Sequence, residues 1–158
     1  MALQTQDMSY LEEEPFGIQN VRDSLSKLVQ SVVEECQNYN KHFSVSKNVI
    51  FAGFSQGAIV SVDLSLHMQE IPRALVLLSG GIVCKNVWEK NASKLKATHV
   101  FQSHGTEDPI LPFAVGKILN QFLTQAGAQV TFVQFQGGHH LNDEVSNGLN
   151  SFLSKITK

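Results

Sequence analysis

Four short runs of strand-forming residues, separated by stretches with helical periodicity, constrain the fold of this chain more than any other feature. The runs cover residues 48–54, 74–79, 98–103 and 129–135. The first is apolar without the alternation of a half-solvated strand, which predicts a strand buried on both faces, as in a parallel sheet. Consecutive parallel strands need a crossover connection, usually a helix.

The stretches between these runs supply the helices. Between residues 17 and 39, apolar side chains recur at three- and four-residue steps, which predicts an amphipathic helix. Further helices are expected at about residues 56–68, from Pro112 to the turn at Gly127, and from an N-cap at Asn142 to Ile156. Residues 82–96 are ambiguous, with one short helix near Trp88. This order predicts an α/β fold with about four parallel strands and flanking helices.

Length and composition bound the function. The 158 residues suit one domain, residues 1–158, in which residues 1–16 form a polar lead-in segment. The net charge of −2, without a run of Lys or Arg, argues against nucleic-acid binding. We expect no signal peptide and no integral membrane contact, and we take the cytoplasm as the location. Cys36 and Cys84 are expected to be buried free thiols.

Any active site of such a sheet lies at the carboxyl ends of the strands. The first strand is followed there by Gly53-Phe54-Ser55-Gln56-Gly57, which fits the pattern G-x-S-x-G between a strand and a helix. A turn tight enough to expose the serine Oγ crowds its neighbours, which favours flanking glycines. We therefore expect Ser55 to be a nucleophile and the N–H of Gln56 to donate to an oxyanion.

Two further polar segments follow the third and fourth strands. His104-Gly105-Thr106-Glu107-Asp108-Pro109 offers Asp108 as the acid that orients a histidine, with Glu107 as the competing acid and a plain turn aspartate as the alternative. Gly137-Gly138-His139-His140 offers a general base on a mobile loop. A metal site at the two adjacent histidines is disfavoured because no acidic partner is nearby in sequence. The chain order Ser, Asp, His is that of α/β-hydrolase triads.

On these residues the chain resembles the phospholipase/carboxylesterase family of α/β-hydrolases, which includes acyl-protein thioesterases. The resemblance begins at about Phe16 and also involves Leu77-Leu78-Ser79-Gly80 and Leu111-Pro112. It implies a serine hydrolase without a cofactor, acting on a small ester, a thioester or a lysophospholipid. Carried over by position, Ser55 is the nucleophile and Asp108 the acid. Bacterial members select His139 as the base, the thioesterase branch selects His140, and we favour His139.

One departure from the family bears on activity. The resemblance implies N-terminal strands and a His-Gly loop that donates a second oxyanion N–H, and no His-Gly precedes Ser55. We therefore expect the fold to lack those strands and the run 49–54 to form an exposed edge, which self-association or a partner would cover. The alternative function is a truncated, catalytically weak or inactive fragment or an interaction module. A nucleotide-binding module is disfavoured because no Gly-rich phosphate loop is present.

Overall fold

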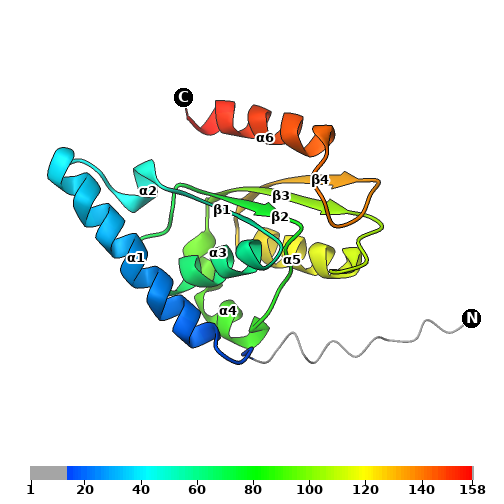
Figure 1. Ribbon diagram of the computed structural model, residues 1–158, viewed down its shortest axis with the longest axis horizontal. Coiled ribbons are helices and arrows are strands. Elements are labelled where there is room, and N and C mark those ends of the chain that lie inside the picture. The colour runs from blue at the N-terminus through cyan, green and yellow to red at the C-terminus, as the bar shows by residue number, and fades with distance from the viewer. Residues whose placement is uncertain (1–13, 158) are drawn as a thin grey trace, which may run out of the picture.

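The computed structural model describes residues 14–157, which form one parallel sheet and the helices around it (Figure 1). The strands are β1 (Ile50–Phe54), β2 (Ala74–Leu78), β3 (His99–Gly105) and β4 (Gln129–Phe135). They lie side by side in chain order, and every neighbouring pair is parallel. The predicted α/β class with four parallel strands is therefore confirmed.

Helices cover the sheet on both faces (Figure 1). One face carries α3 (Gln56–His67) and α5 (Phe113–Gln125), with α1 (Ile18–Tyr39) and α4 (Lys85–Asn91) packed outside α3. The other face carries α6 (Asp143–Ile156), which lies over β3 and β4. The short helix α2 (Val45–Asn48) leads into β1, and a 3-10 turn, η2 (Ala92–Leu95), follows α4.

The core has two parts because successive residues of a strand point to opposite faces of the sheet. On the α3/α5 face, Leu75, Leu77 and Val100 are fully buried against Leu66 of α3 and Leu119 of α5. On the α6 face, the buried set comprises Ala74, Val76, Phe101, Phe135, Val145, Phe152 and Ile156. β3 and β4 are thereby packed on both faces of the sheet.

A buried polar cluster ties the outer helices to α3. Asp63 of α3 accepts hydrogen bonds from Arg22 Nε at 2.8 Å, from Arg22 Nη2 at 3.0 Å and from Trp88 Nε1 at 2.9 Å. Arg22 and Asp63 are both more than nine-tenths buried, and the hydrogen bonds to Asp63 raise the pKa of the guanidinium despite its burial. A buried ion pair is tolerated when such hydrogen bonds satisfy it, as they do here.

Two differences from the sequence prediction concern the serine strand and its approach. No residue of β1 is fully buried, and Ala52 and Phe54 are exposed, because β1 is the outermost strand of the sheet and α6 covers β3 and β4. Burial on both faces was therefore wrong for this strand, whereas the edge position expected from the resemblance holds. The sequence also gave no signal for α2, which has only four residues.

Smaller differences occur elsewhere. The third strand extends to Gly105, so that His104 and Gly105 end the strand and do not follow it. Pro112 caps α5 from outside the helix, while Asn142 caps α6 as predicted by accepting a hydrogen bond from Val145 N. Cys84 is buried, but Cys36 is only half-buried, and both are free thiols.

Residues 1–13 of the expected polar lead-in lie outside the described residues, and Glu14, Pro15 and Phe16 of that segment are exposed. Across residues 14–157, no helix combines the length and the hydropathy that crossing a bilayer requires.

Candidate active site

Ser55 occupies the turn between β1 and α3. Its φ of 56° lies in the left-handed region, which costs a non-glycine residue about 1–3 kcal/mol and persists only where the surroundings enforce it. The enforcing contacts are a hydrogen bond from Ser55 N to Leu78 O at 2.8 Å and the close approach of Gly53 to the first turn of α3. This turn lifts the serine side chain above the carboxyl end of the sheet.

The two glycines of the G-x-S-x-G segment differ in their steric role. A Cβ on Gly53 would lie 2.2 Å from the carbonyl carbon and oxygen of Gly57, so only glycine fits there. A Cβ on Gly57 would meet no atom within 4 Å. The expectation that crowding favours glycine on both sides of the serine is therefore wrong for Gly57.

His139 reaches Ser55 from the loop that follows β4. Its Nε2 lies 2.8 Å from Ser55 Oγ, and its Nδ1 lies 2.7 Å from Asp108 Oδ2. An ionised carboxylate can only accept, so Nδ1 carries the proton and donates to Asp108. Nε2 is then free to accept the hydroxyl proton of Ser55. Three residues that are up to 84 positions apart in the chain thus form one hydrogen-bonded line.

Asp108 is held in place by its own loop. Its Oδ1 accepts hydrogen bonds from Ile110 N at 2.8 Å and from Leu111 N at 2.9 Å, and the residue is only 6% exposed. Burial acts to raise the pKa of Asp108, but the hydrogen bonds from His139, Leu111 and Ile110 outweigh it, and the net pKa is lowered. The carboxylate is therefore charged at neutral pH and oriented toward His139.

The competing residues lie elsewhere. Glu107 is exposed, and its carboxylate accepts a hydrogen bond from Gln136 Nε2 at 3.3 Å. His140 is exposed and packs its ring against Phe135, with ring centroids 5.5 Å apart. Neither side chain takes part in the hydrogen-bonded line of Ser55, His139 and Asp108.

Two further side chains lie beside this line. His104 is fully buried, and its Nε2 donates to Leu111 O at 2.8 Å, which supports the Asp108 loop. It fits because Gly116 of α5 has no side chain: a Cβ there would lie 2.4 Å from His104 Nδ1. Phe54 places its ring 4.8 Å from the His139 ring, between centroids. From the sequence, Phe54 could line an apolar acyl site or pack in the core; its contact with His139 could not be predicted from its position directly before Ser55.

The N-terminus of α3 begins directly after Ser55 and faces the Ser55 side chain. Gln56 is the first residue of this 12-residue helix, and the first N–H groups of a helix have no partner within it. These groups, together with the helix dipole, favour negative charge next to Ser55. No cluster of three or more potential metal ligands (His, Cys, Asp or Glu) occurs in the part of the chain that is described.

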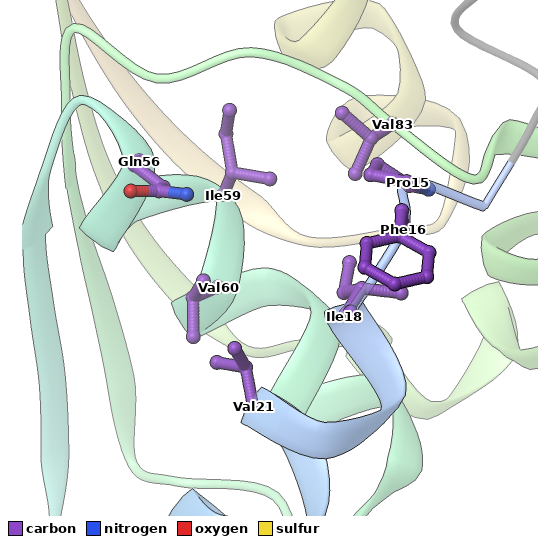
Figure 2. A pocket seen from close by; sticks show the side chains of 9 residues that line it. Pro15, Phe16, Ile18, Val21, Gln56, Ile59, Val60 and Val83 are labelled. Carbon is purple, nitrogen blue, oxygen red and sulfur yellow. The ribbon is translucent and has the colours of Figure 1, made fainter.

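An apolar cavity of about 220 Å³ begins beside Gln56 and lies between α3 and the start of α1 (Figure 2). Side chains of Ile59 and Val60 line it from α3, and Ile18 and Val21 line it from α1. Phe16 stands at its edge and is fully exposed. Asp108 and His139 are not among its lining residues.

Comparison with known proteins agrees with this geometry. The sequence profile of the family described as Phospholipase/Carboxylesterase matches residues 3–157. Acyl-protein thioesterase 1 of Candida albicans is 27% identical over 128 residues, which are 77% of this chain and 55% of that protein. Acyl-protein thioesterase 1 of Saccharomyces cerevisiae is 27% identical over 156 residues, which are 94% of this chain and 64% of that protein. The chain thus spans between half and two thirds of the length of these relatives.

Among solved structures, the crystal structure of Arabidopsis thaliana SOBER1 superposes with a TM-score of 0.70 at 21% identity. The match covers 89% of this chain and 65% of that one. At this identity the likeness shows that the two proteins share a fold.

Proposed function

Because the chain belongs to the phospholipase/carboxylesterase family, we propose that it is a serine hydrolase that cleaves carboxylic ester or thioester bonds. The observation that carries the proposal is the hydrogen-bonded line from Ser55 Oγ through the His139 imidazole to the Asp108 carboxylate, with distances of 2.8 and 2.7 Å. Names of the related proteins, which include thioesterases and a carboxylesterase, support the same reaction class.

In this proposal Ser55 Oγ attacks the acyl carbonyl while His139 Nε2 takes its proton. The tetrahedral intermediate then collapses, His139 protonates the leaving alcohol or thiol, and an acyl-Ser55 ester remains. Water, deprotonated by His139, hydrolyses this ester and restores Ser55. Asp108 keeps the imidazole in the tautomer that has its proton on Nδ1 and stabilises the imidazolium that forms.

The Gln56 N–H supplies the oxyanion donor in this proposal. It follows Ser55 directly and starts α3, so it is aimed at the charge that develops on the carbonyl oxygen. An oxyanion hole with one donor fewer typically lowers kcat about 10²–10³-fold. If Gln56 is the only donor, we expect slow but measurable turnover.

The apolar cavity beside Gln56 supports a substrate with an apolar acyl group. Its lining by Ile59 and Val60, four and five residues after Ser55 in the chain, offers hydrocarbon contacts in the first turns of α3. Filling the cavity with Val60→Phe is expected to lower kcat/KM for an octanoyl ester far more than for an acetyl ester. Val32→Phe, on the exposed side of α1, is the control and should leave kcat/KM for the octanoyl ester relative to that for the acetyl ester unchanged. An equal effect of Val60→Phe on both esters would reject this assignment of the cavity.

The test of the reaction compares neighbouring residues in pairs. We expect p-nitrophenyl butyrate hydrolysis to fall about 10³-fold or more in Ser55→Ala and in His139→Ala, but only slightly in His140→Ala. Likewise, we expect the Asp108→Asn variant to hydrolyse p-nitrophenyl butyrate far more slowly than the Glu107→Gln variant. Equal losses in the two histidine variants, or turnover that survives Ser55→Ala, would contradict the mechanism. A folded wild-type chain without turnover would favour the alternative of an inactive interaction module.

A further inference from the structure

The hydrogen bonds of His139 leave one motion of its ring unrestrained. Each ring nitrogen is tied by one hydrogen bond, Nδ1 to Asp108 and Nε2 to Ser55. These two bonds define a line about which the ring can still tilt. The chain before His139 consists of Gly137 and Gly138, which offer no side chain to restrain it. Catalysis depends on this tilt because it sets the direction in which Nε2 points.

Phe54 supplies the missing lateral contact. Its ring centroid lies 4.8 Å from that of His139, at an interplanar angle of 50°, within the range of favourable aromatic pairs. Its backbone is fixed because it pairs with Leu78 at the end of β1 and because the next residue, Ser55, donates a hydrogen bond to Leu78 O. The backbone that carries the Phe54 ring is therefore fixed directly before the turn of Ser55.

Packing of the core does not account for the place of this phenylalanine. Phe54 is 40% exposed and lies on an edge strand, whereas the phenylalanines of the core, Phe101, Phe122, Phe135 and Phe152, are at most 7% exposed. A large apolar side chain at the surface gains little from burial. The contact that distinguishes Phe54 is the one with His139.

We propose that Phe54 is a positioning residue for His139: the aromatic ring of Phe54 sets the tilt of the imidazole and stabilises the imidazolium that forms when Ser55 loses its proton. The proposal rests on the proposed function, because it assigns Phe54 a role in that reaction. A ring face attracts a cation through its quadrupole, and an aliphatic side chain of similar size does not.

The kinetic test uses a substitution that keeps apolar cover and removes the ring. Phe54→Leu is expected to lower kcat for p-nitrophenyl butyrate about two- to tenfold with KM nearly unchanged, whereas Phe54→Tyr restores kcat. Leu141→Ala removes another exposed apolar side chain close to His139 in the chain and should leave both constants unchanged. A kcat of Phe54→Leu equal to that of wild type would overturn the proposal, and so would a kcat of Phe54→Tyr no higher than that of Phe54→Leu. So would a raised KM at unchanged kcat, which would make Phe54 a substrate contact.

A second readout does not depend on turnover. At a centroid separation of 4.8 Å, we expect the ring current of Phe54 to displace the NMR signals of the carbon-bound imidazole protons of His139 in the resting protein. Phe54→Leu is expected to move these signals and to leave those of His140, which packs on Phe135, in place. Unchanged His139 signals would refute the contact. A wild-type chain without turnover whose His139 signals respond to Phe54→Leu would refute the proposed function and retain the positioning contact.

Discussion

Replacing Gly53 by alanine sets a methyl group against the first turn of α3. The added Cβ would lie 2.2 Å from both the carbonyl carbon and the oxygen of Gly57, and 2.5 Å from Ala58 N. Carbon atoms in contact are normally about 3.5–4.0 Å apart, so the overlap exceeds about 1 Å. All three atoms belong to the backbone, so no side-chain rotation can relieve the overlap, and the strand or the helix must move.

The magnitude follows from that displacement. Overpacking costs typically about 1–3 kcal/mol, and a clash between backbone segments belongs at the upper end, so we expect Gly53→Ala to lower the free energy of unfolding by about 3 kcal/mol. The same shift moves Ser55 and Gln56 relative to His139. A misplacement of about 1 Å can cost roughly 10²-fold in rate, and we expect such a loss of ester hydrolysis.

The matched control is Gly57→Ala, at the other glycine of the segment. It meets no atom within 4 Å and lies inside α3, where alanine is favoured over glycine by about 0.5–1 kcal/mol. Urea unfolding, followed by the fluorescence of the single, buried tryptophan Trp88, measures both variants. Two results would refute the steric role of Gly53: a free energy of unfolding for Gly53→Ala within about 0.5 kcal/mol of wild type, or a larger loss of that free energy in Gly57→Ala than in Gly53→Ala.

Three further predictions concern charge and burial. The pKa of Asp108 is lowered in the fold, so its ionisation stabilises the protein fully above the ordinary carboxyl pKa. This stabilisation is lost as the pH falls from there through the lowered pKa of the folded protein. Asp108→Asn should therefore be less stable than wild type at pH 7, by roughly 1–3 kcal/mol, in urea unfolding; a gap that does not shrink below about pH 4 would contradict this. Burial raises the pKa of Cys84 to about 11, so a thiol reagent at pH 8 should modify Cys36 alone in the native protein, as mass spectrometry would show; rapid modification of Cys84 would be the opposite result. Trp88→Phe removes a donor from buried Asp63 and should cost about 1–3 kcal/mol in thermal or urea unfolding followed by circular dichroism, whereas an unchanged midpoint would mean that Arg22 alone satisfies the carboxylate.

Local patterns were sufficient to predict most elements of the fold. The strand at Gln129–Phe135 and the cap at Asn142 follow from residue types that act within a few positions of one another. The continuation of β3 through His104 does not, because a histidine in a buried strand is tolerated only through its distant partners. These are the Leu111 carbonyl, which accepts its N–H, and Gly116, which leaves it space. No local pattern contains that information.

The same limit applies to the candidate site. Ser55, Asp108 and His139 stand out in the sequence because each follows a predicted strand and because parallel strands bring their carboxyl ends together. The choice between His139 and His140 depends on the path of a glycine-containing loop, and the structure places only His139 beside Ser55 and Asp108. The contact of Phe54 with that ring depends on the path of the same loop, which returns from the end of β4 to the end of β1.

The proposed activity depends on Ser55 being an activated nucleophile, and reaction with a fluorophosphonate tests this most directly. The reagent forms a covalent adduct with a serine whose proton a neighbouring base removes, and peptide mass spectrometry locates the adduct. We predict one adduct, on Ser55, that is absent in Ser55→Ala and forms far more slowly in His139→Ala than in His140→Ala. A folded wild-type chain that forms no adduct, or one labelled at another serine, would contradict the account.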